Sequence, residues 1–217
     1  MLRVVSVFLA CAAVSLFVFA GVPAQGGLIT ITQLDMATAG TYDGQGESFM
    51  PSVNDGYAGP TPTTVALTDF TLQSGGGGST IPGTVYLSIF SGWTAGGTYG
   101  TATGLVGSST NSVTAWSTVA GTNIDFSFDS LSLNYTTKYY ALLTDTTGNL
   151  AFKPMWGRTA GTYSGGNCWI VDGAVNGPVH GVANFSASFQ TVPEPGMLVL
   201  LATGLLGLLC YAWRKRK

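Results

Sequence analysis

Few side chains in this 217-residue sequence have the types and spacing that nucleophilic catalysis needs. A serine or cysteine nucleophile requires a neighbouring base, and the base requires a third group that orients it. His180 is the one histidine, Cys168 could form a dyad with it, and no Gly-x-Ser-x-Gly elbow occurs. The same two residues leave a tetrahedral zinc site incomplete. We therefore expect Cys168 to be a buried strand residue and His180 a loop residue.

Carboxylates offer a second kind of chemistry, because glycoside hydrolysis needs only a pair of them. Asp125 and Asp129 share one face of a predicted strand, and further acids lie in the early loops. Nothing in the sequence selects two of them as a pair, so we expect solvated turn and edge positions. An extracellular hydrolase is thus the least favoured function, and we predict that the protein is not an enzyme.

A calcium site is a further hypothesis for the early acids. Asp43 and Glu47 lie in the stretch Asp43-Gly44-Gln45-Gly46-Glu47, with Asn54-Asp55-Gly56 nearby. Hard oxygen ligands on flexible loops suit Ca²⁺, although the ligand spacing of an EF-hand is missing. Asp43 and Glu47 are therefore the candidate calcium ligands, and no other cofactor is predicted.

Two tryptophans in or beside Gly-rich loops could bind sugars. Trp93 and Trp116 could stack on the apolar C–H faces of sugar rings if their side chains are exposed. Most aromatic side chains in such a domain build the core instead. Both alternatives stay open in the sequence, and the first would make the protein a lectin-like carbohydrate-binding module.

The start of the chain has the features of a secretory signal peptide. One positive charge, on Arg3, precedes an apolar run from Val4 to Ala20, and small residues follow. Signal peptidase would remove residues 1–24 by cleavage after Ala24, with Ala20 as the alternative position. The rest of the protein would then be exported.

A second apolar run lies at residues 196–213 and contains 18 residues without a charge. As a helix it would be about 27 Å long, near the lower limit for crossing a bilayer, so we predict one transmembrane helix. The basic tail Arg214-Lys215-Arg216-Lys217 follows and would hold the C-terminus in the cytoplasm. Before the run, Pro193-Glu194-Pro195 is expected to be extended, since proline disfavours a helix.

This order of triplet, span and basic tail resembles the PEP-CTERM sorting signal of Gram-negative and related bacteria that make exopolysaccharide. Val192-Pro193-Glu194-Pro195 matches the VPEP of that signal, and Thr203-Gly204-Leu205-Leu206-Gly207-Leu208 matches its Gly-interrupted span. The resemblance implies recognition by an exosortase, a membrane-embedded cysteine transpeptidase or protease. Cleavage near the triplet would release the exported part or pass it to a surface acceptor, so the anchor would be transient.

Residues 25–191 are left between the two signals and suffice for one domain with a real core. Three cations and nine acids give this part a net charge of −6, which argues against nucleic acid as a partner. Cys168 is its one cysteine, so no disulfide can form within it.

Alternating apolar and polar residues predict an all-β domain of eight to ten strands, which favours a sandwich. The predicted strands lie at residues 28–32, 65–72, 84–90, 124–129, 138–144, 168–171 and 184–190. The runs at 84–90, 105–109, 126–133 and 138–142 resemble the jelly-roll ectodomains common in PEP-CTERM proteins, which are distantly similar to carbohydrate-binding modules.

The expected protein has three parts: a signal peptide at 1–24, a jelly-roll-like β-sandwich ectodomain at 25–191 and a sorting signal at 192–217. It would be exported through the inner membrane, anchored transiently, and then placed on the cell surface or secreted. There it would have a structural or adhesive role in the exopolysaccharide layer. Its expected partners are signal peptidase, an exosortase, the membrane and exopolysaccharide.

Overall fold

The computed structural model describes most of the chain between residues 27 and 215. The described residues are 27–34, 40–43, 46–76, 81, 83–94, 101–149, 155–159, 163–165, 168–172, 175–178, 182–192 and 195–215. The predicted signal peptide at 1–24 lies outside them. Leu28–Glu194 forms one compact unit, and the helix α2 (Pro195–Arg214) belongs to a second.

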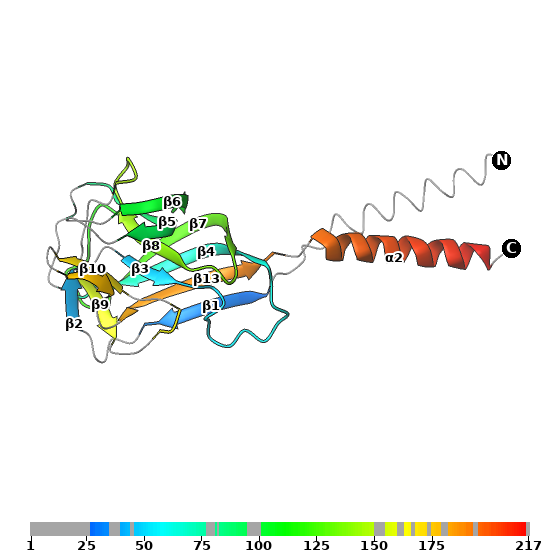
Figure 1. Cartoon of the computed structure of the whole chain (residues 1–217), viewed down its shortest axis with the longest axis horizontal. Helices are drawn as coiled ribbons and strands as arrows, with labels where there is room; N and C mark the ends of the chain where they lie inside the picture. The colour runs from blue at the N-terminus through cyan, green and yellow to red at the C-terminus, as the bar shows by residue number, and fades with distance from the viewer. Residues whose placement is uncertain are drawn as a thin grey trace. The chain divides into compact units, whose positions relative to one another are not determined.

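The described part of the compact unit is all β and antiparallel, which confirms the predicted class. Its first sheet contains β1 (Leu28–Gln33), β13 (Phe185–Thr191), β4 (Thr64–Gln73) and β7 (Asn123–Asn134), in that order. Figure 1 shows β1 in blue beside β13 in orange, so the first and last strands of the unit are neighbours. This arrangement places β13 between β1 and β4.

The second sheet has six strands and the third has three. In order, the second contains β11 (Val175–Pro178), β10 (Cys168–Asp172), β3 (Gly46–Phe49), β8 (Tyr139–Thr144), β5 (Tyr86–Thr94) and β6 (Thr101–Ser108). The third contains β12 (Val182–Ala183), β9 (Met155–Thr159) and β2 (Gly40–Asp43). The described residues thus form thirteen strands, more than the eight to ten predicted, because β2, β3, β9, β11 and β12 are too short to show a pattern.

The core lies between the four-stranded and the six-stranded sheet. Phe49 of the six-stranded sheet packs edge-on against Phe70 of the four-stranded sheet, with ring centroids 5.4 Å apart, and lies 6.0 Å from Phe189. Phe70 in turn stacks on Phe185 at 5.2 Å. All four rings are fully buried. Burial of these large apolar side chains, mostly on alternate strand positions, joins the two sheets into a sandwich.

The free edge of β7 is covered by the segment that follows β6. Thr110 donates its N–H to the carbonyl of Ser127 at 2.8 Å. Asn111 donates Nδ2–H to the carbonyl of Asp125 at 2.8 Å, and its Oδ1 accepts the N–H of Ser127 at 2.7 Å. These bonds occupy backbone groups that would otherwise be open to another strand.

Gly46 lies where β3 passes very close to β8. A Cβ at this position would collide with the carbonyl oxygen of Ala141, which is backbone and cannot rotate away. We expect Gly46→Ala to lower the free energy of unfolding by about 1–3 kcal/mol, because β3 must shift to relieve the overlap. Urea titration followed by tryptophan fluorescence would measure the loss.

Gly107→Ala is the matched control for this substitution. Its added Cβ would lie 2.6 Å from a methyl group of Leu131, and that side chain can move. A loss as large as that of Gly46→Ala would show that the backbone contact at Gly46 does not determine the effect.

Candidate functional site

The residues around the sorting triplet join the last strand to the helix. β13 ends at Thr191, Val192 is 40% exposed, and α2 begins at Pro195. Proline is well suited to the first position of a helix, because its missing N–H has no intrahelical partner there. The triplet therefore does not stay wholly outside the helix as predicted. Pro193 and Glu194 lie outside the described residues.

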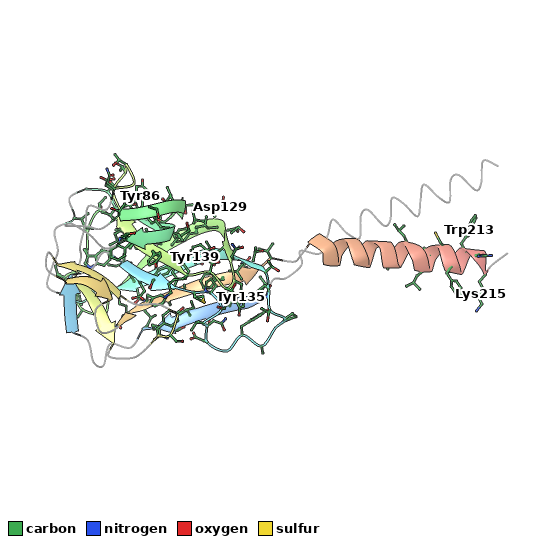
Figure 2. All side chains as sticks on the ribbon, in the orientation of Figure 1. Tyr86, Asp129, Tyr135, Tyr139, Trp213 and Lys215 are labelled. Carbon is green, nitrogen blue, oxygen red and sulfur yellow. The ribbon has the colours of Figure 1, made fainter. Side chains whose placement is uncertain are left out.

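The helix α2 is apolar over most of its length and basic at its end. Its side chains are described from Gly204 onward, and large ones are exposed there: Leu205, Leu206, Leu208, Leu209, Tyr211 and Trp213. Figure 2 shows Trp213 and Lys215 near its C-terminal end. Arg214 lies in the last turn, where a cation interacts favourably with the helix dipole. Arg216 and Lys217 lie outside the described residues.

No helix among the residues described in full is both long and apolar enough to cross a membrane. The predicted span at 196–213 and the cytoplasmic orientation of the tail therefore stay predictions.

The two tryptophans proposed to bind sugars are both buried. Trp116 is 5% exposed and belongs to the core of the sandwich. Trp93 is 9% exposed and packs with Phe90 and Leu142 in a smaller cluster, with its ring 6.4 Å from that of Tyr140. Neither tryptophan presents an open ring face on which a sugar could stack.

The proposed calcium ligands do not lie together on an open loop. Asp43 is the last residue of β2, and its side chain is outside the described part. Glu47 lies in β3, is fully buried, and pairs through its backbone with Cys168 and Ala141. Among the described residues, no group of three or more His, Cys, Asp or Glu side chains could hold a metal ion.

Tyr163, another aromatic residue beside a Gly-rich loop, is also buried. Its hydroxyl donates to the carbonyl of Met50 at 3.1 Å and lies 3.2 Å from the N–H of the same residue. Burial is the main cause of a strongly raised pKa of this hydroxyl, and the negative charges of Glu47 and Asp55 raise the pKa further. The neutral hydroxyl fixes the chain where it leaves β3, which is a structural role.

The other catalytic candidates are not assembled into a site among the described residues. Cys168 lies in β10 with only its backbone described, and His180 is outside the described part. Asp125 and Asp129 are both exposed on β7, and Asp125 accepts a hydrogen bond from the Thr71 hydroxyl at 2.7 Å. Exposure and a neighbouring hydroxyl fit a solvated strand surface better than a catalytic pair.

The turn after β8 is organised by one carboxylate. Oδ1 of Asp145 accepts the Thr147 hydroxyl at 2.7 Å, the Thr147 N–H at 2.8 Å and the Asn149 N–H at 3.0 Å. The hydroxyl of Thr147 and then the N–H of Asn149 lower the pKa of Asp145 below its usual value, because they favour the charged form.

This lowered pKa predicts a pH-dependent contribution to stability. Because the folded pKa lies below the unfolded one, the contribution is complete above the unfolded pKa of about 3.8 and is lost as pH falls through the folded pKa. We expect Asp145→Asn to be less stable than the parent at neutral pH and the difference to shrink in acid. Thermal unfolding from pH 7 down to pH 2 would measure it, with Thr146→Ala of the same turn as control. A difference independent of pH would contradict this linkage.

Comparison with known proteins identifies one segment. Residues 191–217 match the family model of the PEP-CTERM protein-sorting motif. No curated protein and no solved structure matches the chain. The matched segment begins at the last residue of β13 and includes all of α2. The chain therefore carries a PEP-CTERM sorting motif, which indicates an exported protein that an exosortase sorts to the cell surface.

Proposed function

We propose that this chain is a non-enzymatic exported β-sandwich protein whose C-terminal tail anchors it only until an exosortase cuts it. Cleavage would take place near Pro193-Glu194-Pro195, and the freed domain would have a structural or adhesive role in the exopolysaccharide layer. The proposal rests on the sorting motif at 191–217. This motif begins at the last residue of β13, so the segment used for sorting directly follows the folded domain.

The exposed leucines of α2 support membrane anchoring. A helix that shows large apolar side chains around its surface is stabilised when lipid or protein covers them. Arg214, Lys215, Arg216 and Lys217 would keep the end of that helix on the cytoplasmic side. Removal of residues 1–24 by signal peptidase would leave the sandwich on the outer side of the same membrane.

A structural or adhesive role is favoured over a lectin-like one by the burial of Trp93 and Trp116. The outer face of the four-stranded sheet instead presents short polar side chains, among them Thr71, Ser127 and Ser132. Such side chains can form many weak hydrogen bonds with a hydrated polysaccharide, without a pocket that selects one sugar.

Mass spectrometry of the protein before and after export tests the proposal. We expect the cell-surface or secreted form to begin near Gln25 and to end near the Pro193-Glu194-Pro195 triplet. A peptide containing Arg214–Lys217 on that form would contradict transient anchoring. Turnover of a polysaccharide or glycoside by the purified protein would contradict the non-enzymatic role, whatever the state of its tail.

A further inference from the structure

The chain enters and leaves the domain at the same end of the four-stranded sheet. Leu28 at the start of β1 lies opposite Gln190, and Val65, the second residue of β4, lies opposite Thr191. Thr64 lies opposite Asn134, the last residue of β7. We name this end the tether pole and define it as Leu28, Pro60–Val65, Asn134–Lys138 and Gln190–Val192.

The tether pole differs in charge from the rest of the domain. It contains Lys138, which is partly exposed, and no acid, whereas residues 25–191 together carry nine acids and three cations. The exposed acids Asp69, Asp125 and Asp129 lie further along β4 and β7. Asp55 is in the loop that approaches the pole, and its N–H is bonded to Thr30, inside β1.

The tether pole also exposes apolar side chains on a fixed framework. Leu28 is 64% exposed and Val192 is 40% exposed. Tyr135, labelled in Figure 2, holds the pole together. Its N–H donates to Thr63 at 3.1 Å, its carbonyl accepts from Ser52 at 2.9 Å, and its hydroxyl accepts from Asn54 at 2.9 Å. The loop before β4 and the turn after β7 are therefore bonded to each other.

The connection from the tether pole to α2 is very short. Only residues 192–194 separate Thr191 from Pro195, so the Cα atoms of those two residues can be at most about 14 Å apart. If α2 lies in a bilayer, as the proposed function requires, Thr191 cannot move far from the headgroups. The pole itself has no acid that anionic lipids would repel, and the one acid of the connection is Glu194.

We propose that the tether pole lies against the phospholipid headgroups of the membrane while the tail is anchored, an inference that rests on the proposed function. Lys138 meets the anionic headgroups, and Leu28 and Val192 enter the interfacial region. The tether pole is then the end of the sandwich that faces the membrane. The triplet is held next to the lipid surface, where a membrane-embedded enzyme works.

Fluorescence quenching of the mature form, which begins at Gln25 and keeps its tail intact, tests this orientation. A genetically encoded fluorescent residue is placed at Thr61 in the tether pole, at Thr147 or at Cys210 in three separate preparations. Thr147 follows β8, which starts next to the pole at Tyr139 and carries the chain about 17 Å away from it. The protein is reconstituted into phosphatidylcholine vesicles with or without phosphatidylglycerol. Quenchers are nitroxides attached to the headgroup or to the acyl chain.

We expect headgroup quenching to be several-fold stronger at position 61 than at position 147, and stronger still with phosphatidylglycerol. In the variant Lys138→Glu the value at position 61 should fall towards that at position 147. Lys138→Gln, with the charge removed but not reversed, should give an intermediate value. Circular dichroism of each variant shows whether the sandwich is intact.

Two results would overturn the proposal, and they are distinguishable. Equal headgroup quenching at positions 61 and 147, with strong acyl-chain quenching at position 210, would contradict the proposed orientation. The membrane anchor would still be supported in that case. Absence of acyl-chain quenching at position 210 would contradict the membrane anchor itself, and with it the proposed function.

Discussion

Phe70→Ala is expected to lower the free energy of unfolding by about 3–5 kcal/mol. The ring of Phe70 is fully buried and contacts rings on both sides of the core, Phe185 in its own sheet and Phe49 in the opposite sheet. Its removal loses the transfer free energy of the ring and leaves a cavity between the sheets. Since domains of this size are stable by about 5–15 kcal/mol, the variant should lose a large part of its stability.

Leu105→Ala is the control for this prediction, because Leu105 is 57% exposed on β6. Its loss should stay within about 0.5 kcal/mol. Urea unfolding of both variants under identical conditions gives the comparison. Equal losses would mean that the contacts of Phe70 between the two sheets do not carry the stability of the sandwich.

Replacement of the sorting triplet should have the largest effect on the amount of protein that is processed and reaches the cell surface. In the variant Pro193→Ala, Glu194→Ala, Pro195→Ala we expect the processed form to fall at least about tenfold, which corresponds to recognition energy of about 1.4 kcal/mol or more. The precursor should accumulate in the membrane fraction with its basic tail intact. Immunoblots of membrane and surface fractions, from cells that contain the exosortase, would measure both forms.

Gln190→Ala is the matched control, because Gln190 is exposed and lies three residues before the triplet. Its processing should equal that of the parent. Normal processing of the triplet variant would contradict the role of Pro193, Glu194 and Pro195 in sorting. In a strain that lacks the exosortase, the unchanged protein should also stay unprocessed, as the triplet variant does when the exosortase is present.

The longer strands could be predicted because one of their faces is buried and the other is exposed. Ile124, Phe126 and Phe128 of β7 are buried, while Asp125, Ser127 and Asp129, each directly after one of them, are exposed. The period of two in the sequence is a direct result of that geometry. The same reason accounts for the correct prediction of β13, in which Phe185, Ala187 and Phe189 face the core.

β3 could not be predicted, and its residue Glu47 is buried in a strand instead of lying on the open loop that the calcium hypothesis assumed. All four residues Gly46–Phe49 are buried, including Glu47 and Ser48, so no alternation of polarity marks the strand. Glycine and acid next to each other resemble a ligand loop. The neighbouring strands β8 and β10, which come from distant parts of the chain, turn this segment into a central strand.

The tryptophans were difficult for a different reason. Glycines near Trp93 indicate a loop and therefore exposure, but burial depends on which strands pack over the ring. Leu142 of β8 comes to Trp93 only because β8 pairs with β5. The sorting segment, by contrast, is recognisable because its order of triplet, apolar run and cations is contiguous in the sequence.

The position of β13 between β1 and β4 determines how the domain bears mechanical load. A force on the tail enters the domain at Thr191, and its component along β13 pulls that strand past its two neighbours. The hydrogen bonds to both neighbouring strands lie across that axis, so they are loaded in shear and must break together. An edge strand pulled at right angles would open one bond at a time. The strand order would thus make the sandwich resistant to tension along β13 if the tail anchors the protein as proposed.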